Sequence, residues 1–544
     1  MNTPADAVEA ARRHLAANPS DAEALFAFGN ALWFAGEHEA AVTALARAVA
    51  LRPDHTDARN NLGNALVELG RPAEAVPHYR AALAMRPSHA STLYNLANAL
   101  LAADQPAEAE ERFRAALAFD ARHAGAMNNL GNLLRALGRA EEAAELYRQV
   151  IALHPDSAGA RNNLGLALLA LHRAPEAAEC FMEALRLRPD YAHAYNNLGG
   201  AMLALDRPEE AIPLFRHAVG LDAEQVQARF GEGLALLSLG RFQEGWEAYE
   251  SRWQDARFCE GTRERATPRW EGEDAAGRTL LLHSEQGLGD TIQFVRYAPM
   301  VRALGARVVL EVQAPLVPLL EGFADIVLAE GAELPPHDFH CPLLTLPLLF
   351  GTTLESIPAD IPYLRADAVR RAQWRERLGP ARCPRVGIAF SGSDEHPEDA
   401  LRSIPAEQLR PLLTLPGVEF HVAQRDIRAA DAEALSRLPG VRVHGERLED
   451  FAETAALLHH MDLVVSVDTS MAHLAGAMGL PVWLLVQTNA DFRWLRGRTD
   501  SPWYPSARLF RQTRAGEWAR EIALVAAALR AFARQWAGGG RSPA

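Results

Sequence analysis

Residues able to bind an anionic group cluster in one short stretch of the C-terminal third of the chain. The apolar run Leu463–Val467 is short and rich in β-branched residues, which predicts a buried parallel strand. It ends at Asp468, Thr469 and Ser470, three residue types that commonly cap helix N-termini. A helix of small residues beginning at Met471 comes next. Its free backbone N–H groups and positive end would lie at the carboxyl edge of a sheet, an arrangement that suits a diphosphate.

A second loop of interest comes after an earlier predicted strand, Thr279–His283. The loop contains Gly287 and Gly289, which would let the backbone approach a substrate closely, or which only relieve a tight turn. Asp290 stands at the beginning of the next helix. In the structural interpretation of this position, its carboxylate caps that helix.

The elements around these two loops alternate between strands and helices. Apolar runs predict further strands at residues 307–312, 325–328, 385–390, 418–423, 441–443 and 482–486. The stretch 334–362 predicts loops and short helices, and a final helix is expected over about 514–536. Such alternation indicates parallel sheets. A division near residues 366–382 makes two Rossmann-like halves, with a ligand cleft at the carboxyl ends of their strands.

The first half of the chain repeats with a period of 34 residues. Leucines recur at Leu62, Leu96, Leu130, Leu164 and Leu198, and alanines recur at Ala41, Ala75, Ala109, Ala143, Ala177 and Ala211. This pattern resembles the tetratricopeptide repeat, which implies about seven repeats of two helices each over residues 22–255. Such a solenoid forms a groove for an extended peptide or protein. The aromatic-rich stretch 241–253 is expected to cap the solenoid and to dock it onto the second half of the chain.

An asparagine precedes the recurring leucine in five units, at Asn61, Asn95, Asn129, Asn163 and Asn197. Asn is a poor residue for a helix interior, so a column of them needs an explanation. In the structural explanation each amide bonds to a neighbouring turn. In the functional one the column hydrogen-bonds the backbone of a bound chain. The column resembles the asparagine ladder of the O-linked N-acetylglucosamine transferases, which carry such repeats before a catalytic domain, and this resemblance implies the functional role.

Composition narrows the class of protein. The net charge of −14 is unlike the basic face of a general nucleic-acid binder, so no nucleic-acid partner is expected. The chain has no lysine, which excludes a Schiff-base lysine and the lysine of a Walker phosphate loop. Its four cysteines form no CxxC pair, and no metal motif is present. Because it has neither a basic and apolar leader nor an apolar run of about 18 residues, the sequence predicts a cytoplasmic protein without a membrane span.

Three motifs of the second half together resemble glycosyltransferase family 9, which includes the lipopolysaccharide heptosyltransferases. They are Gln286-Gly287-Leu288-Gly289-Asp290, Arg402-Ser403-Ile404-Pro405 and Asp468-Thr469-Ser470-Met471-Ala472-His473. The resemblance covers roughly residues 278–530. It implies the two-domain glycosyltransferase B-type fold, in which the C-terminal half binds the nucleotide-sugar donor.

The resemblance also implies a role for each motif. Asp290 corresponds to the general base, which takes the proton of the acceptor hydroxyl in an inverting transfer. Arg402 corresponds to a basic residue that meets the donor phosphates. Asp468 would hold a sugar hydroxyl, and the backbone amides after it would hold the diphosphate. The remaining donor-site candidates are Thr469, Ser470, Met471, His473, Ser391, Ser393 and Gln424.

Some interpretations stay open within this candidate site. His473, one turn into its helix, can reach the phosphate or can be a packed core residue. The stretch Asp491–Trp494 lies just after the last predicted core strand and is expected to line the sugar or base pocket. A helix N-terminus and an arginine would stabilise the leaving diphosphate, so neither a metal nor another cofactor is expected. Family 9 implies ADP-heptose as the donor, whereas the repeat-bearing transferases imply UDP-N-acetylglucosamine.

Together these features predict an α solenoid of about seven repeats followed by an α/β glycosyltransferase B-type fold of two Rossmann-like domains. The predicted boundaries are residues 1–255 for the solenoid, 256–277 for a linker, 278–375 for the N-terminal half and 376–544 for the C-terminal half. The predicted function is an inverting, metal-independent glycosyltransferase that acts on a hydroxyl of a protein or peptide presented by the repeat groove. The alternatives are an assembly scaffold with an inactive transferase domain, and a transferase that acts on lipopolysaccharide or another glycan.

Overall fold

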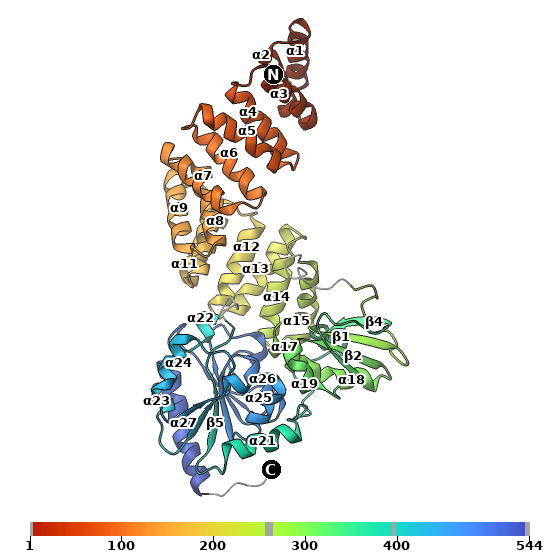
Figure 1. Ribbon diagram of the computed structural model, residues 1–544, viewed down its shortest axis with the longest axis vertical. Helices are drawn as coiled ribbons and strands as arrows, with labels where there is room; N and C mark the ends of the chain where they lie inside the picture. Colours follow the sequence, from red (N-terminus) through yellow and green to blue (C-terminus); the bar gives the residue numbers. More distant parts are fainter. Residues whose placement is uncertain (1–3, 256–264, 394–398, 539–544) are drawn as a thin grey trace. The chain divides into compact units, whose positions relative to one another are not determined.

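The computed structural model describes residues 4–255, 265–393 and 399–538. The chain forms two compact units, Met1–Ala201 and Met202–Ala544. The described part of the first unit is built of helices, and the second unit contains further helices and two parallel sheets (Figure 1). Residues 256–264 of the predicted linker lie outside the described residues.

The first unit is a series of helix pairs. Its helices are α1 (Pro4–Ala17), α2 (Ala22–Phe34), α3 (His38–Leu51), α4 (Thr56–Glu68), α5 (Pro72–Met85), α6 (Ala90–Ala102), α7 (Pro106–Phe119), α8 (Ala124–Ala136), α9 (Ala140–Leu153), α10 (Ala158–Ala170), α11 (Ala174–Leu187) and α12 (Ala192–Ala204), the last of which continues into the second unit. The first helices of successive pairs begin 34 residues apart, at Ala22, Thr56 and Ala90. The predicted unit of two helices is confirmed.

Small residues mark the points at which the two helices of a pair touch. A Cβ atom built on Gly63 would lie 2.5 Å from the ring of Tyr79. Gly165 and Phe181 repeat this close approach further along the chain, also at 2.5 Å. Ala75, from the same column as Ala109, is fully buried between helices. The repeat pattern therefore places a small residue opposite each large ring, as close packing of the helices requires.

The second unit begins with the last helices of the repeat pattern. They are α13 (Pro208–Leu221), α14 (Val226–Ser238), α15 (Phe242–Tyr249) and the 3-10 turn η1 (Glu250–Gln254). Trp246 and Tyr249 of α15 are buried in the same hydrophobic core as Phe294 and Phe492 of the α/β part. The expectation that the stretch 241–253 docks the repeat helices onto the α/β part is confirmed.

The first sheet has the order β3-β2-β1-β4, and all of its strands are parallel. Its strands are β1 (Thr279–His283), β2 (Arg307–Val312), β3 (Ile326–Ala329) and β4 (Phe339–Pro342). The first three lie as predicted, but β4 falls inside the stretch expected to form only loops and short helices, so that prediction was wrong. This edge strand has four residues and ends in a proline, and it therefore lacks the apolar run that identifies a strand.

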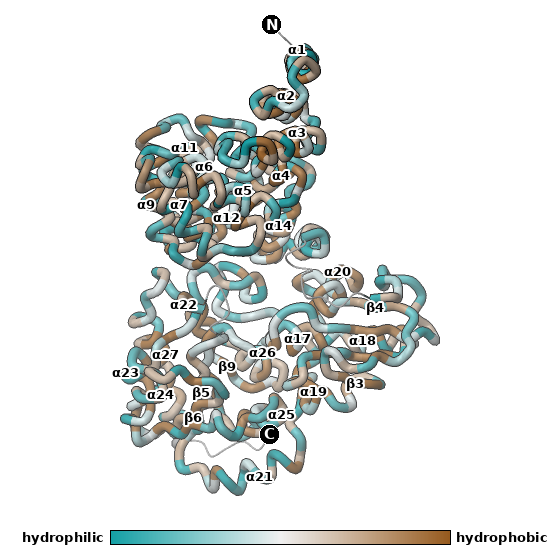
Figure 2. Tube along the Cα trace, turned by 45° about the horizontal axis from the view of Figure 1, so that its top comes forward, coloured by the Kyte–Doolittle hydropathy of each residue, from teal (hydrophilic) through white to brown (hydrophobic). Residues whose placement is uncertain are grey.

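Short helical segments connect these strands and carry part of the candidate site. They are α17 (Leu288–Phe294), η2 (Val295–Tyr297), α18 (Ala298–Ala303), η3 (Ala314–Leu316), α19 (Val317–Leu320), η4 (Leu343–Thr345) and α20 (Leu346–Leu349). The helix α21 (Ala368–Leu378) then occupies the predicted division between the two halves. Only Trp374 and Leu378 of this helix are buried, and Figure 2 shows it as largely hydrophilic, in keeping with its arginines.

The second sheet has the order β10-β9-β8-β5-β6-β7 and is also parallel. Its strands are β5 (Arg385–Ala389), β6 (Glu419–Val422), β7 (Val441–Val443), β8 (Leu463–Val467), β9 (Val482–Val486) and β10 (Ala507–Arg511). β10 was not predicted. The strand order reverses between β5 and β8, and ligands of open α/β sheets bind at such a point.

Helices cover both faces of this second sheet (Figure 1). The helical segments of this half are α22 (Asp399–Arg402), α23 (Arg410–Leu413), α24 (Ala429–Ser436), η5 (Gly445–Arg447), α25 (Phe451–Leu458), α26 (Ser470–Ala477), η6 (Phe492–Trp494) and α27 (Ala519–Gly538). Val464 packs in one core with α25 and α26, whereas Val465 packs in another with α23 and α27. Adjacent strand residues thus point to opposite faces, which explains why β8 is buried throughout and almost entirely apolar.

Candidate functional site

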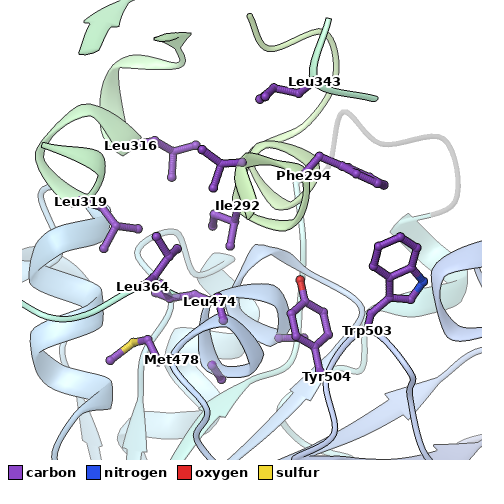
Figure 3. Packing of buried hydrophobic residues seen from close by; sticks show 14 of the residues in the cluster. Ile292, Phe294, Leu316, Leu319, Leu343, Leu364, Leu474, Met478, Trp503 and Tyr504 are labelled. Carbon is purple, nitrogen blue, oxygen red and sulfur yellow. The ribbon is translucent and has the colours of Figure 1, made fainter. Parts of the chain in front are cut away.

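The two loops singled out from the sequence meet in the second unit. Gly289, at the beginning of α17, lies against α26: a Cβ atom built on it would be 2.8 Å from the Cδ2 atom of His473 and 3.5 Å from the Cα atom of Ser470. Figure 3 shows Ile292 of α17 and Leu474 of α26 among the buried residues of one hydrophobic core. Gly289 is therefore required for the close approach of the two helix N-termini.

Asp290 has two partners. Its Oδ2 atom accepts a hydrogen bond of 2.9 Å from the backbone N–H of Gly287, so it does cap α17. Its Oδ1 atom forms an ion pair with Arg493. Burial raises the pKa of Asp290 above its usual range, and the Arg493 charge opposes that rise. The carboxylate is thus held in one orientation by groups from both halves of the α/β part.

Arg493 is a central residue that the sequence identified only as part of a pocket-lining stretch. Its side chain is 6% exposed and also pairs with Asp491 at 2.7 Å. Its guanidinium lies over the rings of Phe492, at 4.4 Å, and Phe294, at 5.5 Å. The carboxylates of Asp290 and Asp491 keep its pKa above the usual range although burial opposes them. No sequence motif singles out this arginine, because its partners come from distant segments.

Asp468, at the end of β8, lies beside a histidine and an arginine. Its Oδ1 atom is 3.9 Å from Nε2 of His473. Its backbone oxygen accepts a hydrogen bond of 3.2 Å from the guanidinium of Arg402. Burial, together with the nearby charge of Asp491, raises the pKa of Asp468 to about 7. This carboxyl group is therefore able to exchange a proton near neutral pH.

We expect this pKa to appear in the pH dependence of stability. The folded protein retains a proton on Asp468 that the unfolded chain, with an ordinary pKa of 3.8, has released. The free energy of unfolding should therefore fall as the pH rises from about 4 to about 7. Replacing Asp468 by Asn should flatten this part of the profile. Calorimetric Tm values of both proteins across this range test the expectation, and identical slopes in the two proteins would contradict it.

His473 is a packed core residue, which was one of its two interpretations. It is 5% exposed, its Nδ1 atom hydrogen-bonds the hydroxyl of Tyr504 at 3.0 Å, and its ring stacks on Trp494 at 5.3 Å. Burial and the charges of Arg493 and Arg296 hold its pKa well below the usual value. A neutral imidazole at this place does not supply positive charge to a phosphate.

Arg402 lies across the loop after β5. A Cβ atom built on Gly392 would overlap its guanidinium, so the glycine is needed for this contact. Asp399 pairs with Arg402 at 3.5 Å and accepts a hydrogen bond of 2.7 Å from Ser403. Because Arg402 also bonds the backbone of Asp468, it lies next to the N-terminus of α26. Thr469, Ser470 and Met471 form that N-terminus, with Thr469 as the N-cap.

The other donor-site candidates differ in their hydrogen bonds and in their exposure. Gln424 accepts a hydrogen bond from the backbone of Phe390 and donates to the hydroxyl of Ser391 at 2.7 Å and to the carbonyl of Asp426 at 3.0 Å. Its amide therefore ties the ends of β5 and β6 together. Ser393 is exposed at the end of the described part of its loop.

The asparagine column of the first unit bonds successive repeats to one another. Each amide nitrogen donates to an asparagine of the preceding repeat, in the pairs Asn61–Asn30 at 2.8 Å, Asn95–Asn64 at 3.0 Å, Asn129–Asn98 at 2.8 Å, Asn163–Asn128 at 2.9 Å and Asn197–Asn162 at 2.8 Å. The structural explanation therefore accounts for at least one N–H donor of each amide in the column. The carbonyl oxygens retain lone pairs for further hydrogen bonds.

Two further observations on the described residues concern metal sites and membrane-spanning helices. No group of three or more His, Cys, Asp or Glu side chains within these ranges has the arrangement of a metal site. None of the helices in the described part of the chain is long and apolar enough to span a membrane.

Family models match both parts of the chain. Models described as tetratricopeptide repeat or TPR repeat match residues 26–90, 66–130, 131–171, 156–224 and 203–257. A model described as glycosyltransferase family 9 (heptosyltransferase) matches residues 423–511. That match includes Asp468, His473 and Arg493, whereas Asp290 and Arg402 lie outside it.

Individual proteins are similar to parts of the chain. Protein FlbA of Caulobacter vibrioides is 33% identical over 319 residues, which are 53% of this chain and 52% of FlbA, so the chain spans about half the length of that relative. Among solved structures, the TPR protein YrrB is 21% identical, with a TM-score of 0.31, over 34% of this chain and 96% of its own. A tetratricopeptide repeat protein from Parabacteroides merdae is 17% identical, with a TM-score of 0.39, over 43% of this chain and 92% of its own.

The fold and the family models together define the class of protein. The first half of the chain is built of tetratricopeptide repeats, and the second half contains a glycosyltransferase family 9 domain. The two parallel sheets of that half, the second with a strand-order reversal beside Asp468, are consistent with a glycosyltransferase B-type fold.

Proposed function

We propose that the protein is an inverting, metal-independent glycosyltransferase that moves a sugar from a nucleotide-sugar donor to a hydroxyl of an acceptor. The observation that supports this proposal is the meeting of two helix N-termini, one beside Asp290 and the other beside Asp468 and Arg402. Asp290 therefore lies in a helix whose beginning packs against the N-terminus of α26, beside which Arg402 lies. Inverting transfer needs a base and a site for the leaving diphosphate on opposite sides of the anomeric carbon.

In the proposed reaction, Asp290 accepts the proton of the acceptor hydroxyl as that oxygen attacks the anomeric carbon. The bond from the anomeric carbon to the diphosphate breaks in the same step, and its electron pair leaves with the diphosphate. Backbone N–H groups at the N-terminus of α26 and the guanidinium of Arg402 stabilise the charge on the leaving group. Arg493, which pairs with Asp290 in this structure, has to release one carboxylate oxygen for the acceptor.

The proposed acceptor is a protein or peptide bound by the repeats. Tetratricopeptide repeats present a surface suited to an extended chain. One N–H of each amide in the asparagine column bonds the preceding repeat, so the column would bind a peptide backbone through the remaining amide N–H groups and carbonyl lone pairs. The proposed donor is a nucleotide sugar, with ADP-heptose and UDP-N-acetylglucosamine as the first candidates.

A thermal-shift screen tests the donor site. The purified protein is heated with ADP, UDP, GDP and CMP and with their sugars, first without and then with a divalent metal. A ligand at 100 times its Kd adds about 2.7 kcal/mol to the free energy of unfolding of the unit that binds it. We expect one nucleotide sugar to raise Tm without metal, and we expect Arg402→Ala to lose that shift.

The matched control for this screen is Arg410→Ala. Arg410 is an exposed arginine of the same half. It pairs with Glu407 at the surface and, within the described part of the chain, has no bond to the N-terminus of α26. It should keep the full shift. A folded protein that responds to no member of the panel would favour the assembly scaffold. A shift that survives Arg402→Ala would place the donor elsewhere.

A further inference from the structure

The last repeat helix makes a direct hydrogen bond to the loop that leads to Asp290. The hydroxyl of Tyr249, in α15, accepts a hydrogen bond of 2.7 Å from the side-chain amide of Gln286. Tyr249 is 2% exposed. The backbone oxygen of Gln286 accepts a second hydrogen bond, also 2.7 Å long, from Gln313. Gln286 directly precedes Gly287, the residue that caps α17, so these bonds hold the beginning of that helix.

A buried ion pair holds the preceding residue of the same loop. Arg252, in η1, donates to both carboxylate oxygens of Glu285, at 2.8 and 3.2 Å. The two side chains are 0% and 1% exposed. Glu285 also accepts the backbone N–H of Leu344 at 2.9 Å. A bidentate pair that is also hydrogen-bonded to the backbone leaves the loop little freedom to move.

The same repeat helix supports the cation that pairs with Asp290. The Trp246 and Tyr249 rings pack against Phe492 at 5.6 and 5.8 Å, and Trp246 meets Phe294 edge-on at 6.1 Å. Phe492 and Phe294 are the two rings over which the Arg493 guanidinium lies. Both the loop before Asp290 and the platform of its counter-ion therefore rest on α15 and η1.

We propose that Tyr249 and Arg252, in the last repeat, are positioning residues for Asp290. They act through Gln286 and Glu285 and fix the direction in which the carboxylate points. This inference rests on the proposed function for its catalytic consequence. If so, the end of the repeat region helps to form the transferase site. Removing α15 and η1 would then displace the carboxylate of Asp290, the proposed general base.

The test uses the full chain with Tyr249→Phe, which removes one hydroxyl and keeps the ring against Trp246 and Phe492. The matched control is Tyr297→Phe. Tyr297 is fully buried in the same core, and its hydroxyl bonds Thr352 at 2.8 Å, away from the loop. Hydrogen exchange of the amides of residues 284–292 is measured by mass spectrometry. We expect about 2- to 10-fold faster exchange in Tyr249→Phe and no change in this loop in the control.

Kinetic measurements distinguish a role in positioning Asp290 from a general contribution to the stability of the core. With the nucleotide sugar that the screen identifies, Tyr249→Phe should lower kcat about tenfold and leave the donor KM unchanged, whereas Tyr297→Phe should alter neither. Gln286→Leu should reproduce the loop exchange, and the double variant should add nothing further. Unchanged loop exchange in Tyr249→Phe, or equal changes in both tyrosine variants, overturns the proposal. Retained activity in Asp290→Asn would instead refute the proposed base, while the exchange result still decides the positioning of the loop.

Discussion

Replacing Asp290 by Asn is expected to lower the rate of sugar transfer by about 10²- to 10⁴-fold, the usual contribution of a general base. The amide oxygen of Asn can still accept the N–H of Gly287, so α17 stays capped. Arg493 keeps its ion pair with Asp491. The change therefore removes the proton acceptor while the surrounding structure is retained, and binding of the nucleotide sugar should persist.

Two measurements on the same preparation check this expectation. Transfer is assayed with the donor found in the screen, and donor binding is measured by the thermal shift. Asp500→Asn is the control, because Asp500 is an exposed carboxylate of the same half that pairs with Arg498 at 2.7 Å, and its replacement leaves Asp290, Asp491 and Arg493 in place. It should retain most of the activity. If the Asp290→Asn protein transfers sugar at the parent rate, or supports the same cellular function, the result favours the scaffold alternative.

Truncation of Trp246 to Ala is expected to destabilise the second unit by about 3–5 kcal/mol. The side chain is 1% exposed and meets Tyr249, Phe294 and Phe492. It fills the space between the last repeat helix and the α/β core, so its removal leaves a cavity at the junction within that unit. Because its neighbours support Arg493, the same change should also reduce transfer activity.

Calorimetry can separate the unfolding transition of the second unit from that of the first, because the two compact units need not unfold together. Phe34→Ala is a suitable control, since Phe34 is a large apolar residue that is 73% exposed in the first unit. Its loss should change stability by no more than about 0.5 kcal/mol. A Trp246→Ala protein that unfolds like the parent would show that the junction does not depend on this ring.

Sequence pattern predicted the elements well wherever they were long or repeated. The 34-residue period located the helix pairs, because the small and large residues that must face each other recur at that spacing. Apolar runs located β1, β2 and β8. The pattern failed for β4 and β10, which lie at sheet edges: Phe339–Pro342 ends in a proline, and Ala507–Arg511 contains two arginines. Edge strands have less need of a continuous apolar run, because they are not enclosed by neighbours on both sides.

The sequence by itself predicted the repeat region, most strands of the two parallel sheets and the helix N-terminus after Asp468, because the pattern that identifies each element lies within a short stretch of the chain. Only the tertiary structure decided what surrounds Asp290. Its partner Arg493 is 203 positions away, and Gln286 in its loop bonds a tyrosine 37 positions earlier. The same holds for Asp468, whose pKa depends on burial and on the charge of Asp491. Ion pairing and desolvation depend on distance in space, and that distance is set by the packing of whole elements rather than by any local pattern.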